Sequence, residues 1–187
     1  MSDLTDFMPR GTSRFSETIT DVLDRVEYRR VTTRDQFDPI YRLRYAAYRR
    51  EEFVPVNSER IVRDEFDDLP NSYAYGVYID DQLVSSLRFH YLTPEFRTSP
   101  SHSVFGDILD PILDSGQTIL DPGRFTSDYE ASLAFPALPF LTLRVAAMAV
   151  WHFSVKYCLH SVRPEHAAFY RRVFHSTQFY GERYYHG

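Results

Sequence analysis

Apolar residues recur along this chain with two different spacings, and the spacing changes several times between segments. An apolar residue at every second position predicts a strand, and apolar residues three or four apart predict a helix. The expected strands are Val26–Val31, Tyr73–Ile79, Leu83–Tyr91, Thr118–Thr126 and Tyr157–Val162. The expected helices are Ser16–Val26, a segment from Thr33 through Tyr48 that ends before Pro55, Phe105–Leu113, Leu138–Phe153 and Pro164–Phe174.

Turn and cap signals separate these elements. The segment Thr33–Gln36 matches a capping box, which marks a helix start, and Pro164 suits the first turn of a helix. Asp80-Asp81 lies between two β-rich runs and predicts a hairpin. The charged segment Ser58–Pro70 and the Pro/Ser-rich segment Thr93–Ser103 are expected to be turns and loops.

The element order predicts one α/β domain. A chain of 187 residues with 43% hydrophobic residues fits a single domain with a sizeable core. Residues 1–15 are polar and mixed, which predicts a mobile arm before a domain that covers residues 16–187. A last β-rich run, Phe179–Tyr185, precedes the end.

Charge and cysteine usage exclude some classes of protein. A net charge of −5 does not favour nucleic acid as a partner. No signal peptide opens the chain and no apolar run is long enough to cross a bilayer, which predicts a cytoplasmic protein without a transmembrane segment. The single cysteine, Cys158, cannot form an internal disulfide. The seven histidines show no metal-ligand spacing, so no metal site is expected.

Three charged motifs stand in a fixed order. The acidic pair Asp64 and Asp67 precedes the hairpin, Arg88 lies in its second strand, and Asp121-Pro-Gly-Arg124-Phe125 follows in the next one. Together with the earlier Arg44, they resemble the motifs of the acyl-homoserine-lactone (autoinducer) synthases and the related N-acyl amino acid synthases. The segments Phe135–Arg144 and Val162–Arg172 look more like the second branch.

The resemblance implies a GNAT-like single domain with a mixed, mostly antiparallel central sheet flanked by helices. The expectation for the last strand of that fold stays open between two alternatives, that it is absent or that it is cut short here. The activity implied is an N-acyltransferase that moves a fatty acyl group from acyl carrier protein to the amine of an amino acid or a similar small molecule. The residues implied to bind substrate are Arg44, Asp64, Asp67, Arg88, Arg124 and Phe125.

Departures from the autoinducer synthases keep two alternatives open. Val54 and Val62 stand where those enzymes carry Trp and Glu, and Asp121 and Gly123 replace Glu and Ser. These changes weaken the case for an acyl-homoserine-lactone synthase that uses S-adenosylmethionine. An inactive GNAT-like module that serves binding or regulation is the third hypothesis.

Acyl transfer from a thioester to an amine has its own requirements. A base must take the amine proton, and Asp121 or Glu130 could do so. A backbone N–H beside a bulge can stabilise the oxyanion, and Gly123 permits such a bulge. The resemblance assigns protonation of the leaving thiolate to Tyr170.

The donor is expected to be an acyl-phosphopantetheine thioester on a carrier protein, with no tightly bound cofactor. Coenzyme A would need Gly-rich backbone at a helix N-terminus for its pyrophosphate, whereas Asp128–Pro139 has no glycine and two prolines. Carrier proteins are acidic, so Arg144, Arg171 and Arg172 are candidates for carrier docking. The alternative interpretation is that these three arginines only form solvated helix faces.

Two questions about geometry stay open. Asp64, Asp67, Arg88 and Arg124 either contact substrate or form a buried ion-pair network that fixes a loop to the sheet. Asp121 and Arg124 face opposite sides of a regular strand, with Phe125 beside Asp121, unless a bulge at Pro122-Gly123 brings the two charges together.

Overall fold

The computed structural model describes residue 20 and residues 22–184. The arm expected over residues 1–15 and most of the first half of the helix expected over Ser16–Val26 lie outside the described residues. Of that helix, Val22 and Leu23 are helical and Asp24 and Arg25 form a turn.

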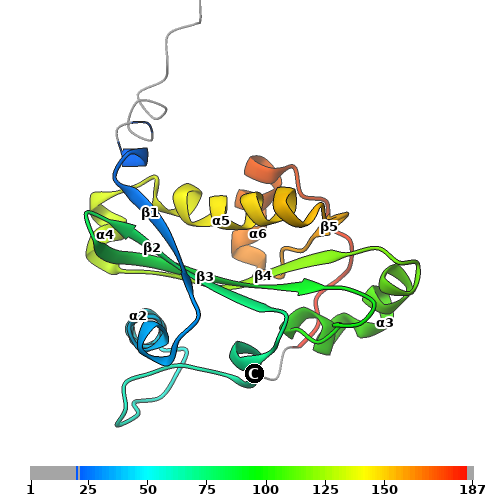
Figure 1. Cartoon of the computed structure of the whole chain (residues 1–187), viewed down its shortest axis with the longest axis horizontal. Coiled ribbons are helices and arrows are strands. Elements are labelled where there is room, and N and C mark those ends of the chain that lie inside the picture. The colour runs from blue at the N-terminus through cyan, green and yellow to red at the C-terminus, as the bar shows by residue number, and fades with distance from the viewer. Residues whose placement is uncertain (1–19, 21, 185–187) are drawn as a thin grey trace, which may run out of the picture.

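Five strands form one sheet in the order β1-β2-β3-β4-β5 (Figure 1). The strands are β1 (Val26–Val31), β2 (Ser72–Ile79), β3 (Gln82–Leu92), β4 (Ile119–Ser127) and β5 (Tyr157–Cys158). The first four pair antiparallel, and β5 pairs parallel to β4. The predicted mixed, mostly antiparallel GNAT-like sheet is therefore confirmed.

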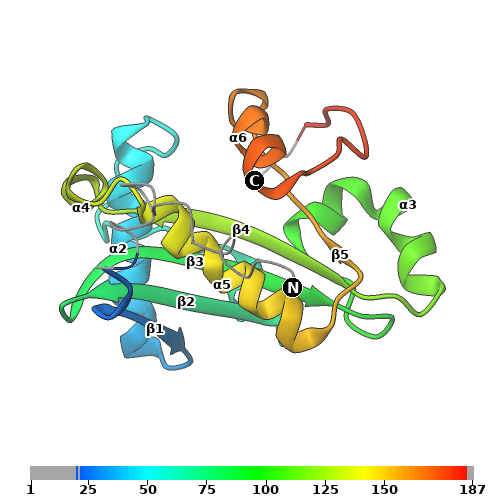
Figure 2. The same cartoon turned by 90° about the horizontal axis from the view of Figure 1, so that it is seen from above.

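Helices cover both faces of this sheet. The helix α5 (Leu138–Phe153) crosses one face and α6 (Pro164–Phe174) lies on the same side, whereas α2 (Arg34–Arg50) lies on the other (Figures 1 and 2). The short 3₁₀ helix η1 (Glu65–Asp68) contacts β2. The remaining helices are α3 (Pro100–Asp114) and α4 (Tyr129–Ala134).

The two faces of the sheet are packed differently. Beneath α5 lies the largest apolar cluster, in which Leu87 and Phe89 of β3 meet Leu138 and Val145 of α5. Beneath α2 the apolar cluster is small and centres on Ile40, which is fully buried. Charged side chains fill the rest of that second layer.

A bulge interrupts β4. Arg88 pairs with Gly123 and Ser86 pairs with Thr126, so β4 places one residue more than β3 between these two pairs. Arg124 takes a left-handed backbone conformation, with φ +51°, which is uncommon for a residue other than glycine. The bulge brings the side chains of Asp121 and Arg124 to the α2 side, while Phe125 packs against the core beneath α5.

Several predicted boundaries were wrong. The strand expected over Tyr157–Val162 is only two residues long, and α3 starts at Pro100, inside the expected loop. The helix α4 was missed, although Asp128 caps it by accepting from Ala131 N at 2.9 Å. Within the described chain, residues 179–184 form no strand.

Candidate active site

The strands β4 and β5 pair only over their first residues. Ile119 and Leu120 pair with Tyr157 and Cys158, and Leu159 N donates to Leu120 O at 2.8 Å. Beyond Leu120, β4 continues to Ser127 with no described strand along this edge. Among the described residues, this stretch of β4 therefore has no strand partner on its outer edge.

A network of buried charges lies on the α2 face of β3. Arg44 Nη1 donates to both carboxylate oxygens of Asp67 at 2.8 Å. Arg88 Nη1 lies 2.8 Å from Asp67 Oδ1 and 2.5 Å from Asp64 Oδ1. The side chains of Arg44, Arg88 and Asp67 are each 1% exposed, so solvent ions screen these pairs little.

Asp64 links this network to β4. Arg124 donates to Asp64 Oδ2 from Nε at 2.9 Å and also from Nη2, and its guanidinium lies 5.7 Å from the centre of the Tyr48 ring. Burial opposes the charge on Asp64, but its hydrogen bonds to Arg88 and Arg124 and their charges lower the pKa of this carboxyl to about 2. Asp64 is therefore ionised at neutral pH.

The network holds one more cation than it has anions. Three arginines face two aspartates, and Arg44 Nε, Arg44 Nη2 and Arg88 Nε have no hydrogen-bond partner within the described chain. Arg124 is the most accessible of the three arginines, with 22% of its side chain exposed. This excess of positive charge can accommodate an anion that reaches Arg124.

Asp121 takes part in a second arrangement, in which its hydrogen-bond partners are neutral groups. Its carboxylate accepts from Ser101 N at 3.0 Å and from Ser101 Oγ at 2.6 Å, at the start of α3. Ser101 Oγ lies 2.7 Å from Ser161 Oγ, and Ser161, which follows β5, is exposed. A chain of hydroxyl groups thus joins the buried Asp121 carboxylate to the surface.

Sequence reasoning missed Ser101 and Ser161. Both belong to segments that were expected to be a loop and a strand, and 60 residues separate them in the chain. The only local signal was the Ser99-Pro100 pair, which marks a helix start, and Ser99 does cap α3 by accepting from His102 N at 3.1 Å. No pattern in a single sequence indicates that β4, the start of α3 and the segment after β5 come together.

The other predicted catalytic residues lie in separate surroundings. A methyl group added at Gly123 would meet nothing within 4 Å, so a ligand can approach the backbone there. Tyr170 is half-buried beside His160, with ring centres 4.6 Å apart, and burial raises the pKa of its hydroxyl. Glu130 is exposed in the first turn of α4. These roles stay predictions.

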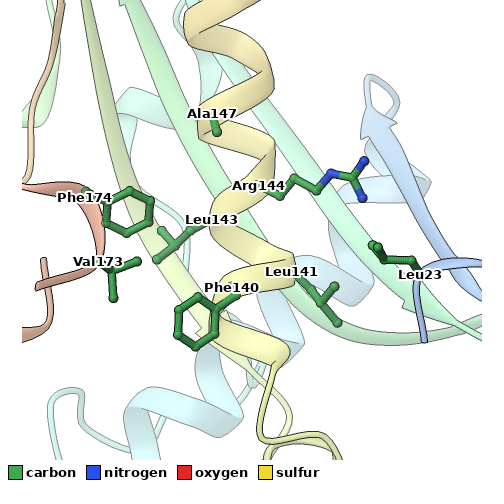
Figure 3. A pocket seen from close by; sticks show the side chains of 8 residues that line it. All are labelled: Leu23, Phe140, Leu141, Leu143, Arg144, Ala147, Val173 and Phe174. Carbon is green, nitrogen blue, oxygen red and sulfur yellow. The ribbon is translucent and has the colours of Figure 1, made fainter. Parts of the chain in front are cut away.

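The candidate docking arginines are exposed on two helices. Arg144 belongs to α5, and Arg171 and Arg172 belong to the last turn of α6. An open apolar hollow of about 300 Å³ along α5 is lined by Phe140 of α5, Phe174 of α6 and Leu23, among others. Arg144 extends from α5 toward Leu23, on the side away from Phe174 (Figure 3).

Two further observations bear on the class of protein. No described helix has both the length and the apolar character needed to span a bilayer. Across residues 20 and 22–184, no three His, Cys, Asp or Glu side chains gather as metal ligands would.

Comparison with known proteins agrees with this geometry. Residues 39–187 match the family described as N-acyl amino acid synthase FeeM. The structure is similar to that of FeeM, an N-acyl amino acid synthase from uncultured soil microbes, at 17% identity and a TM-score of 0.61. The match covers 78% of this chain and 76% of FeeM. No functionally curated protein sequence matches the chain.

More distant structures share the fold. A ribosomal-protein-alanine N-acetyltransferase from Brucella melitensis biovar Abortus 2308 is 13% identical, with a TM-score of 0.57 over 85% of this chain and 99% of that one. Glucosamine-6-phosphate N-acetyltransferase from Arabidopsis thaliana is 9% identical, with a TM-score of 0.56 over 87% and 99%. The chain therefore belongs to the FeeM family of N-acyl amino acid synthases and is an acyltransferase with the GNAT fold.

Proposed function

We propose that this acyltransferase moves a fatty acyl group from an acyl carrier protein to the α-amine of an amino acid. The family supports transfer to an amine. The observation that carries the choice of donor is the start of α5, the helix that follows β4 and α4.

The first turn of α5 offers few N–H groups to a phosphate. Leu138 N already donates to Phe135 O at 2.9 Å, and Phe140 N donates to Ala137 O at 3.0 Å. Pro139, between them, has no N–H. A coenzyme A pyrophosphate would need such groups free. A carrier-bound acyl-phosphopantetheine thioester has a single phosphodiester and therefore needs fewer free N–H groups.

The charge network suits an acceptor that carries a carboxylate. Arg124 is its most exposed cation, and Asp64 holds that guanidinium from the buried side. Arg44, Arg88 and Asp67 hold Asp64 in turn. In this proposal the acceptor carboxylate binds Arg124, which leaves its amine beside the open edge of β4.

The chemical step then has a group for each proton. The amine nitrogen attacks the thioester carbonyl carbon, a β4 N–H near Gly123 stabilises the oxyanion, and the C–S bond breaks. The amine proton passes through the Ser161 and Ser101 hydroxyls to Asp121. Tyr170, which burial keeps protonated, gives its proton to the leaving thiolate. Phe125, on the α5 side of β4, lines the path of the acyl chain.

The donor is tested by comparing thioesters of one acyl chain on a carrier protein and on coenzyme A. We expect a higher kcat/KM for the carrier thioester because α5 lacks a phosphate cradle. Pro139→Ala restores one N–H and should improve only the coenzyme A reaction, by a few-fold, whereas Pro136→Ala, outside the helix, serves as control. Equal or better use of the coenzyme A thioester by the unmodified chain would contradict the proposal.

The acceptor is tested with an amino acid and its carboxamide. We expect the amide to have a KM at least about tenfold higher, since an ion pair with a poorly solvated arginine is lost. Arg124→Ala should remove this preference and leave the two acceptors alike. Arg42→Ala, which breaks an exposed pair with Asp38, should preserve it. Product analysis by mass spectrometry shows whether an N-acyl amino acid forms at all.

Charge reversal at Arg144, Arg171 or Arg172 tests, in the same assay, whether these arginines bind the carrier protein. A raised KM for the carrier thioester, with no change for the coenzyme A thioester, is the expected result if these arginines dock an acidic carrier.

A further inference from the structure

The outward face of α5 is apolar. Ala147, Met148 and Trp151 follow Arg144 at helical spacing, so the four side chains lie on one face. The indole of Trp151 is 85% exposed and Met148 is 39% exposed. The opposite face, which includes Leu138 and Val145, is buried against the sheet. We call Arg144, Ala147, Met148 and Trp151 the outer stripe.

A helix that is apolar on both faces is normally covered on both. All four side chains of the outer stripe are exposed among the described residues, although the Arg144 guanidinium lies 5.9 Å from the centre of the Tyr28 ring. Arg144 and Ala147 also line the apolar hollow (Figure 3). None of the 11 residues of α6 is buried. Surfaces of this kind mark binding sites for proteins or lipids.

The charge of the segment that contains α5 and α6 differs from that of the rest of the chain. Residues 138–174, which comprise α5, β5 and α6, carry five basic side chains and one acidic side chain, a net charge of +4. The rest of the chain carries 16 basic and 25 acidic side chains, a net charge of −9. The basic residues of the segment are Arg144, Lys156, Arg163, Arg171 and Arg172.

We propose that the outer stripe lies on an anionic lipid surface. Trp151 lies on an apolar helix face, with Arg144 on the same helix and Lys156 just beyond its end. Tryptophan and basic residues on an amphipathic helix are typical of helices that lie in the interface of a bilayer. The net charge of +4 favours an anionic partner and opposes contact with the same face of a second copy. The largely exposed indole and the open apolar hollow favour lipid over the charged surface of a soluble partner.

In this arrangement the indole enters the headgroup region, while Arg144 and Lys156 meet lipid phosphates. Each basic residue near such a surface strengthens binding roughly fivefold, so a few of them give reversible attachment. The inference goes beyond acyl transfer, and a vesicle assay contains neither donor nor acceptor. Its failure is therefore distinguishable from failure of the proposed function.

The chain carries its own probe, since Trp151 is its only tryptophan. The full chain is titrated with vesicles of phosphatidylcholine alone and with vesicles that also contain phosphatidylglycerol. We expect solvent-exposed emission without lipid. With anionic vesicles we expect a blue shift, protection from acrylamide quenching and co-sedimentation, all of which weaken as salt rises.

Variants separate the apolar and the charged contributions by co-sedimentation. Trp151→Ala should weaken binding about tenfold or more, because the indole is the largest apolar group of the stripe, and Trp151→Phe should restore most of it. Arg144→Glu should weaken binding to anionic vesicles only. Controls off the stripe are Phe96→Ala, which truncates a phenyl ring that is 51% exposed, and Arg34→Glu in α2.

Three results would overturn the proposal. One is the absence of any emission change or sedimentation with anionic vesicles at low salt. Another is blue-shifted emission in lipid-free buffer, which would mean that another part of the chain or a second copy covers Trp151. The third is an emission shift produced by an acidic carrier protein and not by vesicles, which would assign the stripe to protein docking.

Discussion

A cluster of two carboxylates, Asp64 and Asp67, lies beside β4, and a second site in the strand itself holds the Asp121 carboxylate; the two differ in their partners. Asp64 and Asp67 are held by three guanidinium groups, whereas Asp121 is held by a hydroxyl and a backbone N–H of Ser101. A guanidinium does not give up its proton in a protein, so we expect the first cluster to fix positions and not to relay a proton. A hydroxyl both donates and accepts, so the second can pass one on. The hydrogen-bond partners of a carboxylate therefore indicate whether it is suited to a structural role or to proton transfer.

Removal of one anion from the first cluster should have the largest effect. Asp67→Ala leaves the fully buried Arg44 without its carboxylate, and we expect the free energy of unfolding to fall by about 3–5 kcal/mol. Urea unfolding measures this loss. Asp68→Ala, next along the chain with a side chain that is 71% exposed, should have almost no effect. A similar small effect in both variants would mean that the network contributes no stability.

Asp121→Asn should lower kcat about a hundredfold, with only a small change in melting temperature. The amide still accepts a hydrogen bond from Ser101 but takes no proton. Ser99→Ala is the matched control. It removes the N-terminal cap of α3, the helix that contains Ser101, at a cost of about 1 kcal/mol, and it should leave kcat unchanged.

Ser161→Ala sharpens this test. If the amine proton reaches Asp121 through the hydroxyls, kcat falls about tenfold in this variant, although Ser161 is exposed and adds little to stability. Ser176→Ala removes another surface hydroxyl, which is 2.7 Å from His160 Nδ1, and should keep full activity. An active Asp121→Asn protein would remove Asp121 from catalysis whatever Ser161 does.

Lowering the pH should remove the stabilisation that the ionised Asp64 gives the folded chain, over a defined pH range. The pKa of Asp64 is about 2 in the folded chain, below its ordinary value of 3.8, so the folded state is stabilised above pH 4. That stabilisation, about 2 kcal/mol, is lost as the pH falls from about 4 to 2. Asp64→Asn should flatten this part of the stability curve. Asp80→Asn, at an exposed pair with Arg25, should retain it.

The parts of the fold that periodicity controls were predictable. The bounds of β1, α5 and α6 agree with the predictions, because each element has a continuous apolar face and clear ends. The strand β5 is shorter than expected, since its later residues leave β4 and no local signal records the loss of a partner strand. Propensity alone cannot show which strands pair.

The candidate site was predictable in part. Asp64, Asp67, Arg88 and Arg124 were predicted either to bind substrate or to form one ion-pair network, and the resemblance added Arg44 to the substrate-binding residues. The structure brings all five together. The alternative of a buried network is the geometry observed, although a role in substrate binding stays a prediction. The hydroxyl chain could not be predicted, because its contacts arise only once α3 and the segment after β5 reach the same strand.

The open edge of β4 has a consequence for self-association. An unpaired strand edge is a template on which another chain can add a strand and start an aggregate. Pro122 lacks an N–H to offer, and the bulge at Arg124 bends the strand out of the flat geometry that such addition needs. Pro122 and the bulge at Arg124 are therefore expected to keep a strand of another chain from pairing with this edge.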